Sequence, residues 1–244
     1  GKTVDQTSTT FGIRQVEVDA ARGFRLNGKP LKLKGGCVHH DNGPLGAAAI
    51  DRAEQRRVEL MKANGFNAIR TSHNPPSPAF LEACDRLGML VIDEAFDQWE
   101  VPKNGTDYHR YFKEWAERDI AAMVRRDRNH PSVVIWSIGN EIPERFEAEA
   151  SARRLRAAVL GEDPTRPITA AICSDWGNVS VTFSRPTSPL YRLRARAVGA
   201  FLAIPVRTAL TTTWVISATE IWADPVDLSG RRRISGISTT TRFS

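Results

Sequence analysis

Cysteine is scarce in this sequence, and several other missing features narrow the class of protein. The 244 residues include three cysteines, Cys37, Cys84 and Cys173, whose odd number and wide spacing predict neither a disulfide framework nor a metal cluster. No apolar run reaches about 18 residues, so we expect no membrane span and no membrane partner. At 41% apolar content, the chain is long enough to bury one large core or two small ones.

Targeting signals are also missing from the N-terminus. Residues 1–6 are polar and lack the apolar stretch of a signal peptide. No initiator methionine is present, which suggests a fragment or a processed chain. These features leave the localisation open and favour the cytoplasm.

Lysine is absent from the last quarter of the chain. Residues 179–244 hold nine arginines and three acidic residues, which gives this segment a net charge of +6. The whole chain holds 34 basic and 28 acidic residues, so residues 1–178 hold 25 of each and are neutral overall. The segment also contains 18 Ser or Thr residues, and its composition sets it apart as an unassigned region.

Two interpretations of residues 179–244 stay open. One is a basic tail that meets the phosphates of a nucleic acid through Arg231, Arg232 and Arg233. The other is that the segment is not native sequence and arises from a shifted reading frame or a misassembled end. The abrupt loss of lysine favours the second interpretation, so we expect no nucleic-acid partner.

The first 178 residues alternate between strand and helix patterns. Residues 12–19 alternate apolar and polar side chains, as a strand with one buried face does. Five further strands are predicted over residues 31–38, 66–70, 89–92, 132–139 and 168–172. Four helices are predicted between them, at about residues 51–62, 78–87, 112–123 and 144–160. We expect Asp51 and Glu54 to form a capping box at the first helix, and Ser77 to cap the second.

Five strands that alternate with four helices indicate a parallel sheet with crossover helices. The first strand-to-helix loop lacks a phosphate-binding glycine pattern, which disfavours a doubly wound nucleotide-binding fold. Polar side chains instead follow the strands: His39, His40 and Asp41; Arg70, Ser72, His73 and Asn74; Asp93 and Glu94; Asn140 and Glu141. Loops after the strands build the active site of a barrel. We therefore predict an α/β fold, a (β/α)8 TIM barrel with about five strands recognisable and an irregular or incomplete C-terminal part.

The pair Asn140–Glu141 closes the apolar run of residues 132–139. An apolar environment disfavours the ionised form of a carboxylic acid and can make it a proton donor. We therefore expect Glu141 to lie above an apolar floor at the mouth of the sheet.

Several segments resemble the catalytic barrel of glycoside hydrolase family 2, the β-galactosidase and β-glucuronidase group. They are GFRLNGKPLKLKG (23–35), NAIRTSHNP (67–75), VIDEA (91–95), RDRNHPSV (126–133) and WSIGNE (136–141). Residues 39–41 and 44–48 resemble the β-galactosidase branch more closely. The resemblance covers about residues 9–178. It divides the chain into the end of a β-sandwich domain with a linker (1–20), the N-terminal part of the barrel (21–178) and the unassigned segment (179–244).

The resemblance implies hydrolysis of terminal β-linked sugars, with β-galactosides favoured, by a retaining double displacement. It makes Glu141 the general acid/base and Asn140 the ligand of the sugar 2-hydroxyl. Arg70 would keep the nucleophile carboxylate ionised. The other sugar contacts that it implies are His73, His40 and Asp41. A carbohydrate is the expected partner, no cofactor or metal is expected, and the oligomeric state stays open.

Structural roles stay open for some of these side chains. Arg70 could pair with Asp93 or Glu94, and His73 could shape the turn before Asn74. His39 is expected to be structural. Two further residues with expected structural roles are His130, which closes a helix, and Trp136, which belongs to the core.

A retaining glycosidase needs a second carboxylate about 5–5.5 Å from the first. The family places it on a glutamate at the end of the seventh strand, and Glu220 is the only glutamate after residue 178. Glu220 follows the β-prone residues 211–217 and is the candidate nucleophile, although its surroundings do not resemble the family's segment.

Three hypotheses follow: a β-galactosidase-like hydrolase, an inactive or sugar-binding remnant without a nucleophile, and a nucleic-acid-binding protein.

A barrel with only five strands is incomplete and leaves two open strand edges. We therefore expect the chain alone to hydrolyse no chromogenic β-galactoside above a Glu141→Gln control.

Overall fold

The structure of the protein is a computed structural model that describes residues 4–19, 22–143, 146–174, 178–184, 191–194 and 222–223. Its centre is a run of five parallel strands. In spatial order they are β4 (Gly35–His39), β5 (Ala68–Ser72), β6 (Leu90–Glu94), β7 (Val133–Ser137) and β9 (Ile168–Ser174). The predicted parallel sheet is therefore confirmed.

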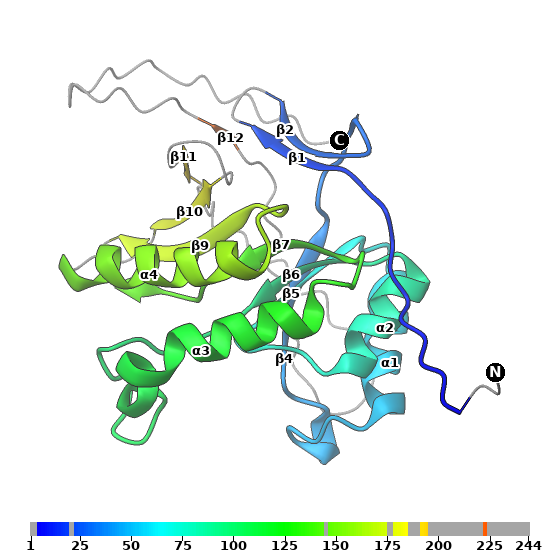
Figure 1. Ribbon diagram of the computed structural model, residues 1–244, viewed down its shortest axis with the longest axis horizontal. Helices are drawn as coiled ribbons and strands as arrows, with labels where there is room; N and C mark the ends of the chain where they lie inside the picture. The colour runs from blue at the N-terminus through cyan, green and yellow to red at the C-terminus, as the bar shows by residue number, and fades with distance from the viewer. Residues whose placement is uncertain are drawn as a thin grey trace, which may run out of the picture.

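Four helices connect these strands and cover the sheet: α1 (Asp51–Ala63), α2 (Pro78–Leu87), α3 (His109–Asp127) and α4 (Phe146–Glu162). In Figure 1, α1 and α2 lie side by side near β4, and α3 and α4 lie side by side near β7 and β9. The order strand, helix, strand is that of part of a (β/α)8 barrel. None of the helices in the described ranges combines the length and apolar character that crossing a membrane requires.

The sheet continues beyond β9 in a different way. A short strand, β8 (Ile142–Pro143), pairs in parallel with β9. The next three strands, β10 (Asn178–Ser184), β11 (Tyr191–Arg194) and β12 (Trp222–Ala223), follow in antiparallel order. A complete (β/α)8 barrel has only parallel strands, so the antiparallel strands β10, β11 and β12 depart from the barrel pattern.

A small antiparallel sheet precedes the parallel strands: β1 (Val16–Asp19), β2 (Gly23–Leu26) and β3 (Lys29–Pro30). The predicted strand over residues 12–19 begins at Val16, and the one predicted from residue 31 begins at Gly35. A short 3-10 turn, η1 (Gly43–Leu45), lies in the loop after β4.

The small sheet closes one side of the parallel sheet. Val18 and Phe24 pack with Val134 and Ile135, which lie in the first half of β7. Figure 1 shows β1 and β2 on the side of the sheet away from α3. The carboxyl ends of the strands, where the polar residues collect, are thus left for a site.

The main core lies between the sheet and the helices. Its largest fully buried side chains include Phe80 of α2, Phe112 and Ile120 of α3, and Trp136 of β7. Each such side chain contributes roughly 1.5–3 kcal/mol by leaving water. The indole Nε1 of Trp136 donates to Asp163 Oδ2 at 2.9 Å, so the expected core role of this tryptophan is confirmed.

The start of α2 is the one predicted. Ser77 Oγ accepts a hydrogen bond from the Phe80 amide at 3.2 Å, and Pro78 occupies the first turn. Gly88 ends the helix in the left-handed conformation, with φ of 68°. Glycine adopts this conformation without the steric cost of a Cβ atom.

The capping box predicted at α1 is wrong. Residue Ile50 stands at the N-cap without a side-chain hydrogen bond, and Asp51 is already helical. The side chain of Glu54 is buried and does not return to the helix end. Its carboxylate accepts from Asn42 Nδ2 at 2.8 Å and from Ser77 Oγ at 3.0 Å. These partners come from distant segments, and a buried carboxylate needs such donors more than an exposed helix end does.

Candidate active site

The carboxylate of Glu94 is the centre of a polar cluster at the carboxyl ends of β5, β6 and β7. Arg70 donates to Glu94 Oε2 from Nη2 at 2.7 Å and from Nε at 2.9 Å. Ser137 Oγ donates to the same oxygen at 2.6 Å, and His73 Nδ1 lies 2.6 Å from Oε1. Although burial opposes it, the Glu94 carboxylate raises the pKa of the Arg70 guanidinium above its ordinary value. The cluster therefore holds Arg70 as a cation.

Strand alternation decides which acidic residue pairs with Arg70. Side chains of adjacent residues in a strand point to opposite faces, so Glu94 and Asp93 separate. Glu94 faces the polar cluster, while Asp93 is buried against Asp127 of α3. Of the two partners expected for Arg70, Glu94 is the one it contacts.

Asn140 lies next to Arg70 with its side-chain amide fixed on both sides. Arg70 Nη2 donates to Asn140 Oδ1 at 2.9 Å, and Asn140 Nδ2 donates to Asp97 Oδ1 at 2.9 Å. The backbone is held as well, because the Asn140 amide donates to the Phe96 carbonyl and Trp99 Nε1 donates to the Asn140 carbonyl, both at 2.8 Å.

Glu141 has a more polar environment than its sequence predicts. Its backbone has a positive φ of 47°, and 54% of its side chain is exposed. Lys103 Nζ lies 3.1 Å from Glu141 Oε2 and 2.7 Å from Asp97 Oδ1. The expected apolar floor is therefore wrong, since the chain turns at Glu141 and the carboxylate meets an ammonium group. Burial acts to lower the pKa of Lys103, but hydrogen bonds to Asp97 and Glu141 raise it overall.

The loop after β4 carries two of the predicted site residues, His40 and Asp41. His40 Nε2 lies 3.1 Å from the Pro75 carbonyl, and exposed Asp41 accepts from the Gly43 amide at 2.9 Å. Both contacts are to backbone atoms of loops, and the expectation that His40 and Asp41 contact a sugar stays a prediction.

His39 lies nearer to the cluster than its expected structural role implies. Its ring meets the His73 ring edge-on, with the centroids 5.0 Å apart. Burial and then the neighbouring His73 lower the pKa of His39. The signal for this position is its place as the last residue of β4, in register with Ser72 of β5.

Sequence reasoning missed the roles of Asp97, Lys103 and Ser137. Ser137 could have been found, because it pairs with Glu94 in the register of β6 and β7. Asp97 and Lys103 belong to the loop after β6, whose path no strand period predicts. Glu220 lies outside the described residues. Within those residues, no group of three or more His, Cys, Asp or Glu side chains could hold a metal ion.

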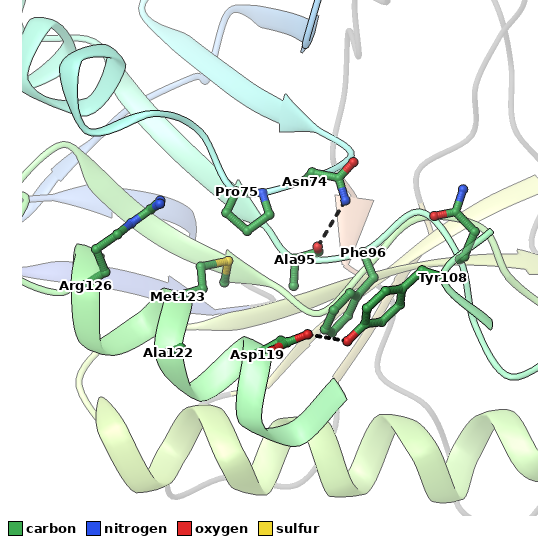
Figure 2. Close-up of a pocket in the computed structure, with 10 residues that line it drawn as sticks. Asn74, Pro75, Ala95, Phe96, Tyr108, Asp119, Ala122, Met123 and Arg126 are labelled. Carbon is green, nitrogen blue, oxygen red and sulfur yellow. Dashed lines mark hydrogen bonds between the residues drawn. The ribbon is translucent and has the colours of Figure 1, made fainter. Parts of the chain in front are cut away.

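A hollow of about 410 Å³ adjoins the loops after β5 and β6 and lies over α3. Figure 2 shows Phe96 and Tyr108 at one side of it and Met123 and Arg126 at the other. Phe96 belongs both to this hollow and, through its carbonyl, to the support of Asn140. The hollow therefore borders the polar cluster without containing it.

Comparison with known proteins agrees with this geometry. Residues 16–191 match the family model described as glycosyl hydrolases family 2, TIM barrel domain. A β-galactosidase of Bacteroides ovatus is 44% identical over 200 residues, which cover 68% of this chain and 24% of that protein.

Solved structures agree as well. A family 2 member from Bacteroides cellulosilyticus superposes with a TM-score of 0.65 at 57% identity, covering 68% of this chain and 22% of that one. A β-glucuronidase of Parabacteroides merdae gives a TM-score of 0.58 at 33% identity, covering 70% and 22%. The chain thus spans about a quarter of the length of these relatives or less. On the match of its residues 16–191, the chain belongs to glycoside hydrolase family 2.

Proposed function

We propose that this chain supplies the acid/base half of a retaining β-glycosidase site. Its substrate would be a terminal β-linked sugar, with β-galactosides favoured. The observation that carries the proposal is the oriented pair Asn140–Glu141, which lies beside the Arg70–Glu94 ion pair at the carboxyl ends of the strands.

Each group of this half-site has a step to perform. Glu141 would protonate the glycosidic oxygen as the leaving group departs, and would then remove a proton from the attacking water. Asn140 would bind the sugar 2-hydroxyl, a contact that strengthens as positive charge develops on the sugar ring. The exposed position of Glu141 gives it access to a leaving group and to water.

The nucleophile must be a different carboxylate from Glu94. Both oxygens of Glu94 are already in contact with side chains, namely Arg70, Ser137 and His73, and none of its side chain is exposed. A carboxylate in this setting holds the site in place and cannot easily reach a sugar carbon. Glu220, the candidate nucleophile that the sequence offers, lies outside the described residues.

The choice of sugar rests on resemblance. The Bacteroides ovatus relative is named a β-galactosidase, and the Parabacteroides merdae structure is titled a β-glucuronidase. The residues after β4, His39 to Asp41 with Pro44 to Ala48, favour the galactosidase branch.

Two assays, each with its own variants, test the proposal. Release of nitrophenol from p-nitrophenyl β-galactoside and β-glucuronide is measured for the chain, Glu141→Gln and Glu220→Gln. Binding of a galactose-configured iminosugar, whose cation imitates the charged transition state, is measured by calorimetry for the chain and Asn140→Ala. We expect saturable binding that Asn140→Ala weakens, and no turnover above the Glu141→Gln control.

The other outcomes are equally informative. Turnover that Glu141→Gln and Glu220→Gln both abolish would place a complete catalytic pair in this chain. Turnover unaffected by Glu141→Gln, or neither turnover nor iminosugar binding, would contradict the proposal. Salt-sensitive binding of DNA that is lost on deletion of residues 179–244 would favour the nucleic-acid hypothesis instead.

A further inference from the structure

The geometry points to Asp97 as a positioning residue of this site, which fixes the orientation of the Asn140 amide and links it, through Lys103, to the Glu141 carboxylate. The inference rests on the proposed function, because it assigns a task to a residue that supports the proposed sugar ligand. Asp97 itself would not touch the reacting atoms.

The first support is the way the loop after β6 holds Asn140. Three hydrogen-bonding groups of this loop bond to Asn140: the Phe96 carbonyl, the Asp97 carboxylate and the Trp99 indole. They fix its backbone amide, its side-chain amide and its carbonyl. The loop therefore binds both the N–H and the C=O of the Asn140 backbone. Of the three groups, Asp97 is the one that contacts the Asn140 side chain.

The second support is the chemistry of an amide group. An asparagine side chain has one acceptor end and one donor end, and its two ends can exchange places by a half-turn about its last bond. A guanidinium can only donate and an ionised carboxylate can only accept. Arg70 on one side and Asp97 on the other are therefore compatible with one orientation of the Asn140 amide. That orientation leaves one N–H and one oxygen lone pair for a sugar hydroxyl.

The third support is the charge of Asp97. Burial acts to raise the pKa of this carboxyl, but hydrogen bonds from Lys103 and Asn140 lower it below its ordinary value. The carboxylate is thus held ionised, as a fixed acceptor must be. Its Oδ1 atom accepts from both Asn140 Nδ2 and Lys103 Nζ. The same Lys103 ammonium group also donates to Glu141 Oε2.

The test uses the sugar 2-hydroxyl as its probe. Calorimetry gives the affinity of a galactose-configured iminosugar and of its 2-deoxy counterpart for the full-length chain. Their ratio measures the contribution of the 2-hydroxyl contact. The variants are Asn140→Ala, Asp97→Asn and, as a matched control, Lys103→Met, which removes the other partner of Asp97 Oδ1 and leaves the Asn140 contact. The melting temperature of each variant reports whether it is folded.

We expect the chain to prefer the iminosugar over its 2-deoxy counterpart by about fivefold to tenfold, the value of one hydrogen bond. Asn140→Ala and Asp97→Asn should reduce this ratio to about one, and Lys103→Met should leave it within about twofold of its original value. A purely structural role for Asp97 would weaken both ligands equally and leave the ratio unchanged.

The failure of the inference can be told from failure of the proposed function. If Asn140→Ala removes the preference and folded Asp97→Asn keeps it, Asp97 does not position the amide and the inference is wrong. If Asn140→Ala keeps the preference, or the chain binds neither iminosugar, the proposed function fails and the inference falls with it. Should Asp97→Asn not fold, Asp97→Glu, which keeps an ionised acceptor, must keep the preference; a folded Asp97→Glu without it also overturns the inference.

Discussion

Two neighbouring acidic residues of β6, Asp93 and Glu94, have different electrostatic environments. Glu94 is buried against a cation and two further polar side chains, so its charge is compensated. Asp93 is buried as fully, yet its Oδ2 atom has no hydrogen-bond donor among the described residues. Burial and then the adjacent Asp127 raise the pKa of Asp93 well above its ordinary value. Two carboxyl groups can hydrogen bond to each other only when one of them carries a proton, which favours the protonated form of Asp93.

Replacement of Asp93 by asparagine is expected to change how stability depends on pH. Because the folded-state pKa of Asp93 is raised, its contribution to stability is present below the ordinary value of 3.8 and is lost as the pH rises through the folded-state value. The asparagine cannot ionise, so Asp93→Asn gains stability relative to the parent as the pH rises above about 4. The gain approaches about 1.4 kcal/mol per pH unit between the two pKa values.

Urea denaturation of both proteins at several pH values between about 2 and 8 measures this difference. Asp85→Asn is a control of opposite sign. Burial acts to raise the pKa of Asp85, but hydrogen bonds from His130 and Ser132 lower it. The contribution of Asp85 is therefore present above its ordinary pKa and lost in acid. A pH-independent difference for Asp93→Asn would show that Asp93 and Asp127 do not share a proton.

At the scale of elements, the loop after β6 and the end of β7 fit together through a glycine. Gly139 has a φ of 151°, and a Cβ atom placed there would lie 2.6 Å from Trp99 Cζ2 and 2.9 Å from the Phe96 carbonyl oxygen. The absence of a side chain lets the Trp99 ring approach closely enough to donate to the Asn140 carbonyl. Gly139, which precedes Asn140 and Glu141, is therefore constrained by packing and by backbone conformation together.

Gly139→Ala should lower both stability and iminosugar affinity. Strain at this φ and the contact with Trp99 each cost about 1–3 kcal/mol, so we expect a loss of about 2 kcal/mol or more in the free energy of unfolding. Gly161→Ala is the matched control, because Gly161 lies in α4 and a Cβ there has no neighbour within 4 Å. It should be neutral or stabilising by up to about 1 kcal/mol. Equal stabilities for the two variants in urea would refute the packing argument.

The sequence predicted the elements and the strand-end residues because both depend on local patterns. The periods of the five strands and four helices are local, and Arg70, His73 and Asn140 follow directly from the ends of their strands. Loop geometry is not local. For that reason the sequence missed Asp97 and Lys103.

The two wrong expectations have the same origin. The capping box at α1 failed because the Glu54 carboxylate is bound by Arg57 of its own helix and by Asn42 and Ser77 of other segments. The apolar floor beneath Glu141 failed because the chain turns there, with a positive φ, towards a lysine of another loop.

On the scale of the whole molecule, the described sheet is an open one. The spatial order of strands ends at β4, whereas a closed barrel pairs its first strand with its last. The matched relatives are about four times longer than the stretch that this chain covers. A retaining site needs two carboxylates, and the described part holds Glu141, the proposed acid/base. The activity of this half-site is therefore best tested inside a complete barrel.

A graft supplies that complete barrel. Residues 16–174 of this chain would replace the corresponding segment of the Bacteroides cellulosilyticus family member, with which the chain shares 57% identity. This identity favours compatible packing at the new interfaces, since cores tolerate substitutions that keep volume and pattern. We expect the graft to hydrolyse a chromogenic β-glycoside that the relative itself hydrolyses. Glu141→Gln in the graft should lower kcat/KM by about 10²–10⁴-fold, the usual contribution of a general acid/base. A graft that melts like the relative but shows no turnover dependent on Glu141 would refute the assignment of Glu141 as the acid/base.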